Sequence, residues 1–293
     1  MLDPAGATAA RSYLYVPGDR PGRLAGALAR GADALNADLE DSVARAAKDR
    51  ARETVACWLT GLPAGGPPGQ VWIRVNADLA AADIGIVSAA VTGVVVPKAE
   101  PALLAEVDEL LARRERATGL DRGRLRVLPL IETAAGLLQA TAVAAAPRVA
   151  RLGLGEADLA AELGLRPGPG REELAPIRLQ VVIVSAAAGL AAPVAPTSTD
   201  FRDLTALRSS TQALLRLGFR ARTAIHPAQL PVINEVFTPS ADEVGRARRL
   251  VAALEAAERD GAGVTVDEDG AMVDVAVARS AREVLARAQA ASG

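Results

Sequence analysis

Short apolar runs alternate with helix-length amphipathic segments along most of this chain, and no other sequence feature constrains its fold as much. Such alternation is typical of parallel βα units. Eight repeats within about 225 residues match the size of a closed (β/α)8 barrel, whereas the commonest open, doubly wound sheets need fewer strands. The sequence therefore predicts a TIM (β/α)8 barrel. The eight strands are predicted at residues 12–16, 34–39, 71–76, 93–97, 127–131, 149–154, 192–196 and 222–225.

The chain changes character after this series of repeats. The sequence predicts a helix over 240–259, two short strands joined by a turn at Asp269 and Gly270, and a last helix over 275–289. This helix-hairpin-helix piece is too small to fold alone. Its apolar face of Ala, Val and Leu favours docking on another subunit. We expect a barrel catalytic domain over 1–230 and a lid and oligomerisation element over 231–293.

The charges nearly cancel, because 33 basic residues stand against 35 acidic ones, and only 2% of the residues are aromatic. This balance argues against nucleic-acid binding, which needs a basic surface and stacking side chains. The single cysteine, Cys57, excludes an internal disulfide, and the single histidine, His226, excludes histidine-rich zinc sites. We expect a cytoplasmic protein without a membrane span, since no stretch approaches the roughly 18 apolar residues of a span and no secretion signal is visible.

Polar and charged residues follow the predicted strands, where a barrel of this type places its catalytic groups. They are Asp38 and Glu40 at the second strand, Arg74 in the third, Lys98 after the fourth, Glu132 after the fifth and Asp158 after the sixth. Because side chains alternate along a strand, Asp38 and Glu40 share one face, and this polar face must point into the barrel. We therefore expect a pocket with apolar layers below and carboxylates at its rim.

A carboxylate rim without histidines predicts a site for a hard metal ion. Mg²⁺ is held in proteins by one or two carboxylates together with waters and substrate oxygens. Arg74 adds a planar guanidinium suited to a substrate carboxylate. Together they indicate an enolate site, in which a metal ion chelates a 2-oxo acid. Two alternatives stay open: each carboxylate taken singly also fits a helix N-cap or a surface ion pair, and Lys98 could form a Schiff base.

Eight motifs, in this order, resemble the citrate lyase β-subunit-like family, which includes citryl-, malyl- and citramalyl-CoA lyases. The motifs are RSYLYVPGDRP at 11–21, GAD at 31–33, DLED at 38–41, VWIRVN at 71–76, VPKAE at 96–100, PLIETAAG at 129–136, GEADL at 155–159 and IHPAQ at 225–229. The resemblance extends from Arg11 to the final helix. Motifs in a fixed order are far more specific than any one of them alone.

The resemblance implies roles for individual residues. Glu132 and Asp158 match the family's Mg²⁺ ligands, and Arg74 matches its substrate-carboxylate arginine. Asp274 matches an aspartate that closes over a neighbouring subunit's site and serves as acid or base. Asp274 is equally well suited to cap the last helix. We expect a homotrimer or hexamer in which Asp274 acts in trans.

The residues and the resemblance together predict a Mg²⁺-dependent carbon–carbon lyase. It would cleave a 3-hydroxy-3-carboxyacyl thioester, such as citryl-, malyl- or citramalyl-CoA, into a 2-oxo acid and an acyl thioester, or run in reverse. The expected substrate contacts are Arg74, Glu132, Asp38, Glu40 and Lys98. Alternatives are an acyl-CoA thioesterase or malate-synthase-like condensing enzyme on the same site, and a non-catalytic subunit of a lyase complex. For His226, a structural role is favoured over a role as base.

Overall fold

The computed structural model describes residues 10–63, 67 and 69–292. The chain divides into two compact units, one up to Asn234 and the other from Glu235. This boundary lies within helix α10 (Leu230–Phe237), close to the division expected after residue 230. Residues 1–9 and 293, at the outer ends of the two expected domains, lie outside the described residues. Among the described helices, none is long and apolar enough to cross a membrane.

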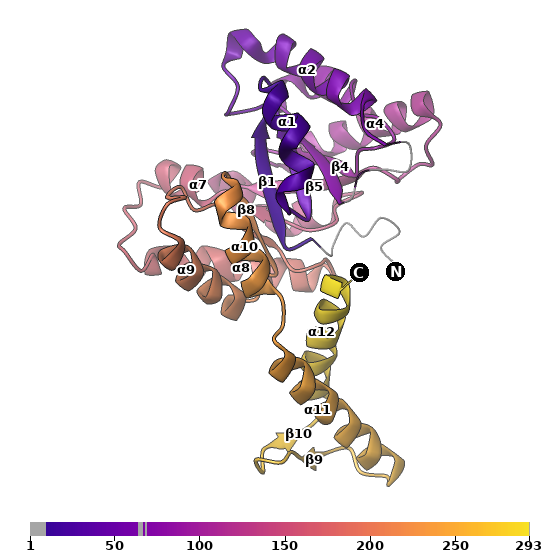
Figure 1. The fold of residues 1–293 in the computed structure, drawn as a ribbon, viewed down its shortest axis with the longest axis vertical. Helices are drawn as coiled ribbons and strands as arrows, with labels where there is room; N and C mark the ends of the chain where they lie inside the picture. The colour runs from indigo at the N-terminus through magenta and orange to yellow at the C-terminus, as the bar shows by residue number, and fades with distance from the viewer. Residues whose placement is uncertain (1–9, 64–66, 68, 293) are drawn as a thin grey trace. The chain divides into compact units, whose positions relative to one another are not determined.

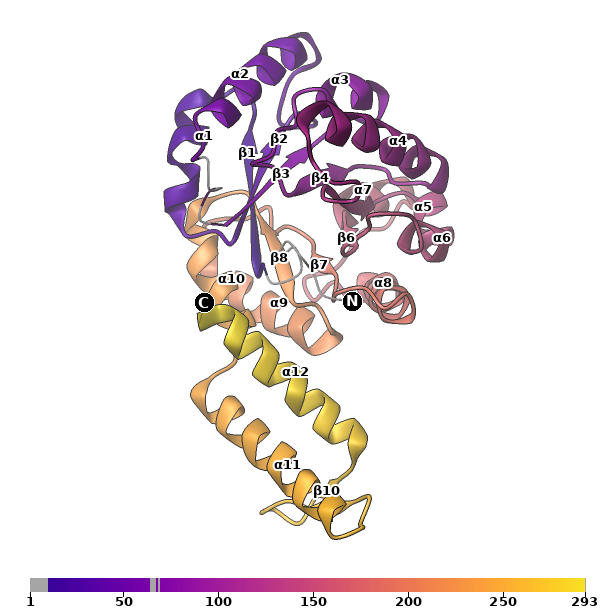
Figure 2. The ribbon, with the colours of Figure 1, turned by 90° about the vertical axis from the view of Figure 1, so that its right-hand side faces the viewer.

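Eight parallel strands form a closed barrel in the order β1 to β8, so that β1 pairs with both β2 and β8. The predicted TIM barrel is thereby confirmed, and Figure 2 shows the strands inside a ring of helices. The strands are β1 (Ser12–Pro17), β2 (Ala34–Asp38), β3 (Gln70–Arg74), β4 (Gly93–Val96), β5 (Arg126–Ile131), β6 (Gly153–Leu154), β7 (Val194–Ala195) and β8 (Ala221–Ala224).

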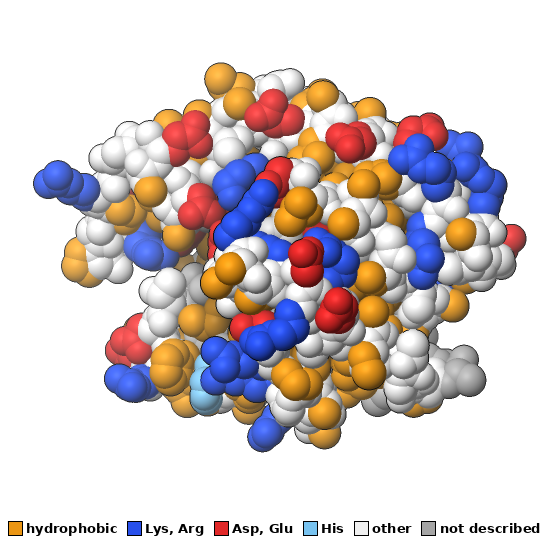
Figure 3. All heavy atoms as spheres, turned by 90° about the horizontal axis from the view of Figure 1, so that it is seen from above, with side chains coloured by type: hydrophobic (Ala, Val, Ile, Leu, Met, Phe, Trp, Pro, Cys, Tyr) orange, Lys and Arg blue, Asp and Glu red, His pale blue; other side chains and the backbone are white. Residues whose placement is uncertain are grey.

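Helices follow the strands along the chain, as expected for βα repeats (Figure 1). They are α1 (Pro21–Ala27), α2 (Lys48–Thr60), α3 (Ala80–Ile84), α4 (Pro101–Thr118), α5 (Ala134–Leu138), α6 (Ala140–Ala144), α7 (Glu156–Glu162), α8 (Ala175–Ala187), α9 (Leu204–Leu217) and α10. Acidic and basic side chains are intermixed over the face of the molecule seen in Figure 3, in keeping with the net charge of −2.

The interior of the barrel is apolar below its polar rim. Tyr13, Trp72, Val95 and Leu128 belong to one buried cluster, which contains residues from seven of the eight strands. The tilted rings of Tyr13 and Trp72 lie with their centroids 6.2 Å apart. This packed floor leaves the space above it, at the carboxyl ends of the strands, as the place for a site.

Two strands are much shorter than predicted. The stretches 149–154 and 192–196 contain only β6 and β7, of two residues each, although Val149 forms an isolated bridge with Val127. The buried guanidinium of Arg151 explains part of the difference, because Nε and Nη2 donate to the carbonyl oxygen of Ala192 at 2.9 and 2.6 Å. A side chain thus satisfies a carbonyl that a longer ladder would have used.

The second unit contains the predicted helix-hairpin-helix elements. They are α11 (Ala241–Arg259), the antiparallel pair β9 (Thr265–Val266) and β10 (Met272–Val273), and α12 (Val275–Ser292). Ser240 and Glu243 form a capping box at the start of α11. Leu254, Val273 and Ala278 form the small buried core of this second unit. The role of this unit as a lid stays a prediction.

Candidate functional site

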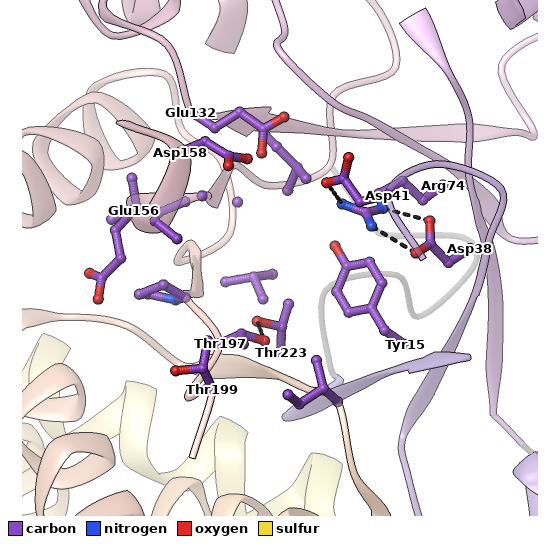
Figure 4. Close-up of a pocket in the computed structure, with 18 of the residues that line it drawn as sticks. Tyr15, Asp38, Asp41, Arg74, Glu132, Glu156, Asp158, Thr197, Thr199 and Thr223 are labelled. Carbon is purple, nitrogen blue, oxygen red and sulfur yellow. Dashed lines mark hydrogen bonds and ion pairs between the residues drawn. The ribbon is translucent and has the colours of Figure 1, made fainter. Parts of the chain in front are cut away.

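A cavity of about 470 Å³ opens at the carboxyl ends of the barrel strands. Its polar lining comprises Tyr15, Arg23, Asp38, Asp41, Ser42, Arg74, Glu132, Glu156, Asp158, Arg171, Thr197, Thr199 and Thr223. Figure 4 shows three groups in it: Glu132 beside Asp158, Arg74 joined to Asp38 and Asp41, and threonines on the remaining side. The groups come from strands far apart in sequence, which only barrel closure brings together.

Glu132 and Asp158 lie next to each other on one side of the cavity (Figure 4). Glu132 follows β5 and is almost fully buried, whereas Asp158 lies in the first turn of α7 and is exposed. The backbone N–H of Lys98 donates to Oε1 of Glu132 at 2.8 Å. Lys98 has a φ of 48°, a left-handed conformation that costs free energy in a lysine.

The backbone at Gly155 passes directly against the carboxylate of Glu132. A Cβ atom on residue 155 would overlap Oε2 of Glu132 and lie 2.6 Å from its Cβ atom. Only glycine therefore leaves room for Glu132 in this position. The GEADL motif thus contributes both the ligand candidate Asp158 and the space for Glu132.

Burial is the main cause that raises the pKa of Glu132 to about 7; the Lys98 N–H opposes this rise, and the negative charges of Glu40 and Asp158 add to it. Such a site favours a cation between the two carboxylates. The described residues hold no cluster of three or more metal-ligating Asp, Glu, His or Cys side chains. Two hard oxygen donors facing an open cavity fit Mg²⁺, which keeps waters or substrate oxygens in its remaining positions.

Arg74 is held by three carboxylates. Its Nε and Nη2 donate to the two carboxylate oxygens of Asp38, both at 2.7 Å, and Nη1 lies 2.8 Å from Glu40 and 3.4 Å from Asp41. Burial alone would raise the pKa of Asp38, but the hydrogen bonds and charge of Arg74 lower it overall. The planar fork expected to receive a substrate carboxylate is thus occupied by Asp38, and only the opposite edge of Arg74 faces the cavity.

Glu40 and Lys98 lie beside the cavity but are not among the residues that line it. Nζ of Lys98 lies 3.0 Å from Oε1 of Glu40, and half of the lysine side chain is exposed. Burial raises the pKa of Glu40 despite the nearby charges of Arg74 and Lys98. Burial lowers the pKa of Lys98, but the hydrogen bond to Glu40 and the negative charge of Glu40 raise it more, so the pKa is raised overall. The amine therefore stays charged, which does not favour imine formation.

Glu156 also lines the cavity, yet its carboxylate points away from Glu132 and Asp158 (Figure 4). Arg178 donates to both of its oxygens, Nε at 2.9 Å and Nη2 at 3.0 Å, and Arg171 forms a further ion pair with it. These arginines compensate its buried charge. Of the rim carboxylates, Glu132 and Asp158 are therefore the pair left without an arginine or lysine side-chain partner among the described residues.

Two further residues singled out in the sequence have structural contacts. Asp274 caps α12, since its Oδ1 accepts from the N–H of Val277 at 2.9 Å. His226 caps the short 3-10 helix η5 (Pro227–Gln229) through Nδ1, which accepts from Ala228 at 3.1 Å. Its ring stacks on Phe201 with centroids 4.6 Å apart. The favoured structural role of His226 agrees with these contacts, and the cap leaves open a second role for Asp274.

Sequence reasoning missed Tyr15, which lines the cavity with its ring 4.8 Å below the Arg74 guanidinium. The alternation of β1 could have found it, because Tyr15 shares the interior face with Tyr13. It also missed Thr223, whose hydroxyl oxygen lies 2.9 Å from that of Thr197, a residue that follows the seventh strand.

Comparison with known proteins identifies the relatives of this fold and site. Residues 11–227 match the HpcH/HpaI aldolase/citrate lyase family. The chain belongs to this family. It is 34% identical over 282 residues to (3S)-malyl-CoA thioesterase of Cereibacter sphaeroides, covering 96% of this chain and 95% of that protein. It is 32% identical over 307 residues to L-malyl-CoA/beta-methylmalyl-CoA lyase of the same organism, covering 95% and 94%.

A solved structure shares the whole fold of this family member. The protein CitE from Mycobacterium tuberculosis, in complex with magnesium, acetoacetate and coenzyme A, superposes with a TM-score of 0.75 at 31% identity, covering 95% of this chain and 98% of that one. The resemblance drawn from the motifs is confirmed, and with it an enzyme of a lyase family. The individual roles of Glu132, Asp158, Arg74 and Asp274 stay predictions.

Proposed function

We propose that this family member is a Mg²⁺-dependent carbon–carbon lyase acting on a 3-hydroxy-3-carboxyacyl thioester of coenzyme A. The observation that carries the proposal is the Glu132–Asp158 pair, which lies in the same cavity as Arg74 and has no cationic side chain between its carboxylates among the described residues. The magnesium and coenzyme A in the related CitE complex support the same reading. Cleavage would yield a 2-oxo acid and an acyl thioester.

The carboxylates of Glu132 and Asp158 would hold the metal ion. When bound, Mg²⁺ supplies a Lewis acid that draws electron density from the oxygens of the oxo acid. Gly155 leaves the space for Glu132, and the Lys98 N–H fixes the direction of its carboxylate. The free edge of Arg74 would orient the substrate carboxylate, and Asp38 holds that guanidinium in place. These residues thus bind and orient the oxo-acid half of the substrate.

In cleavage the 3-hydroxyl group gives its proton to solvent water, the bond between C2 and C3 breaks, and its electron pair stays on C2 as the thioester enolate. A proton must then reach C2. Asp274 is the residue proposed to deliver it, in a homotrimer or hexamer whose lid element closes over a neighbouring subunit. The cap on α12 uses Oδ1 of Asp274. Oδ2 is therefore the oxygen proposed to carry the proton.

A thioesterase is the second candidate, because one relative at 34% identity carries that name. The two activities differ in the bond that breaks. A lyase releases a 2-oxo acid and keeps the thioester, whereas a thioesterase releases the thiol of coenzyme A and a hydroxy acid. Both would use an oxygen polarised by the same carboxylate-held metal ion.

Product analysis separates these candidates directly. The purified protein is incubated with malyl-, citramalyl- and citryl-CoA, each with Mg²⁺ and with EDTA, and free thiol and 2-oxo acid are measured in parallel. The proposal expects 2-oxo acid without an equal amount of thiol, and only with Mg²⁺. Thiol release without 2-oxo acid would assign the thioesterase instead, and a full rate in EDTA would end the metal hypothesis. No turnover of any thioester would favour a non-catalytic subunit.

A further inference from the structure

The hydroxyl group of Tyr15 is a polar group of the cavity that the proposed function does not use. Tyr15 lies near the end of β1, on the interior face of the barrel, and its side chain lines the cavity. Its hydroxyl has no hydrogen-bond partner among the described residues. Figure 4 shows it pointing into the cavity, away from the strand that carries it. A donor held in this way is available to a ligand.

The hydrogen bonds of Arg74 show why a ligand needs a second donor here. A guanidinium has five N–H groups. Two of them bind Asp38 at 2.7 Å each, and the Nη1 group faces Glu40 at 2.8 Å and Asp41 at 3.4 Å. Nη1 thus has two carboxylates beside it, through one long hydrogen bond and one ion pair, whereas one N–H of Nη2 has no carboxylate beside it. A carboxylate accepts at both oxygens, so Arg74 in this setting cannot supply the two-pronged contact that a free guanidinium offers.

The position of Tyr15 and the proton on its hydroxyl group suit it to be this second hydrogen-bond donor. The Arg74 guanidinium stacks on its ring at 4.8 Å from the centroid, which fixes the hydroxyl relative to the free edge of the arginine. Burial raises the pKa of Tyr15; the charge of Arg74 lowers it, and the charges of Asp38 and Glu132 raise it again. The hydroxyl therefore keeps its proton throughout the physiological pH range.

We propose that the Tyr15 hydroxyl and the free edge of Arg74 together bind the carboxylate of the 2-oxo acid, one donor to each oxygen. The identity of this ligand rests on the proposed function. Tyr15 is then a substrate-binding residue that selects a planar carboxylate next to the metal-held oxygens. A phenylalanine at this position would keep the stacking on Arg74 and lose the second donor.

The test is Tyr15→Phe, with oxalate as the probe because it presents a carboxylate beside a second oxygen donor, as a 2-oxo acid does. Oxalate binding is measured by calorimetry in saturating Mg²⁺. A hydrogen bond to a charged group is worth enough to raise the Kd of oxalate about 10- to 100-fold when it is lost. The Kd of Mg²⁺ and the melting temperature should stay unchanged, because the ring still packs against Arg74.

Tyr13→Phe is the matched control, since it removes a hydroxyl from the same strand face deeper in the barrel, where Arg151 lies 3.4 Å away. Oxalate affinity should be unchanged in this variant. Equal oxalate affinity in wild type and Tyr15→Phe overturns the role of Tyr15 and leaves the proposed function standing. An equal loss in both tyrosine variants also overturns it, because barrel packing then explains the effect. A wild-type protein that binds no oxalate overturns the proposed function and this role with it.

Discussion

Replacing Glu132 by glutamine should make the metal-free barrel more stable at alkaline pH. Burial raises the pKa of this carboxyl group from 4.5 to about 7, so ionising it in the folded state costs about 3 kcal/mol at pH 8. The unfolded chain ionises the same group without this cost. Glutamine removes the charge and can still accept from the Lys98 N–H, which donates at 2.8 Å to Oε1 in the native protein.

The pH dependence of this effect follows from the raised pKa. Below pH 4.5 the group is protonated in both states and the substitution gains little, whereas the gain grows between pH 4.5 and 7 and is complete above pH 7. Urea unfolding in EDTA, followed by circular dichroism at pH 4 and pH 8, measures both limits. Mg²⁺ should stabilise the wild type at pH 8 and have little effect on Glu132→Gln.

Glu156→Gln is a control with the opposite expected sign. Its carboxylate compensates Arg178 and Arg171, so the same chemical change should lower the free energy of unfolding. A Glu132→Gln protein that is less stable than the wild type at pH 8 in EDTA would refute the reasoning about the carboxylate pair.

Three further predictions concern the proposed roles of other residues. Gly155→Ala should displace Glu132 and weaken Mg²⁺ binding at least tenfold by calorimetry, because the added Cβ overlaps the carboxylate; unchanged affinity would mean that Glu132 is not a ligand. Arg74→Lys should raise the KM for the 2-oxo acid in the condensing direction and lower stability by about 1–3 kcal/mol, since an ammonium cannot hold Asp38 at both oxygens; an equal KM would leave Arg74 a purely structural role. Mixing inactive Asp274→Asn and Glu132→Ala chains should restore partial activity if Asp274 acts in trans, and a monomer by light scattering, or no restoration despite subunit exchange, would contradict that arrangement.

The barrel could be predicted from the sequence because its signal is repeated and local. Each strand is a short apolar run between helical segments, and the carboxyl-end residues Asp38, Arg74 and Glu132 follow from strand direction alone. The two shortest strands could not be bounded, since Arg151 satisfies a carbonyl by a long-range side-chain bond that no local pattern signals.

The partners of the charged residues were the part of the site that sequence could not supply. Asp38 and Glu156 look like equivalent rim carboxylates in the sequence, yet each is held by arginines from other strands or helices. Pairing of this kind depends on distances across the barrel. This pairing decides which carboxylates remain available to bind a metal ion. It also occupies most of the N–H groups of Arg74, so that few of them are available to a substrate.

The central claim is that Glu132 and Asp158 hold a Mg²⁺ ion, and titration calorimetry with Mg²⁺ at pH 8 tests it most directly. The variants are Asp158→Asn and, as a control from the same cavity, Asp41→Asn, whose carboxylate lies 3.4 Å from Arg74. The account predicts one bound Mg²⁺ per chain in the wild type and in Asp41→Asn, and at least a tenfold weaker affinity in Asp158→Asn. Equal Mg²⁺ affinity in all three proteins, or loss of binding only in Asp41→Asn, would contradict it.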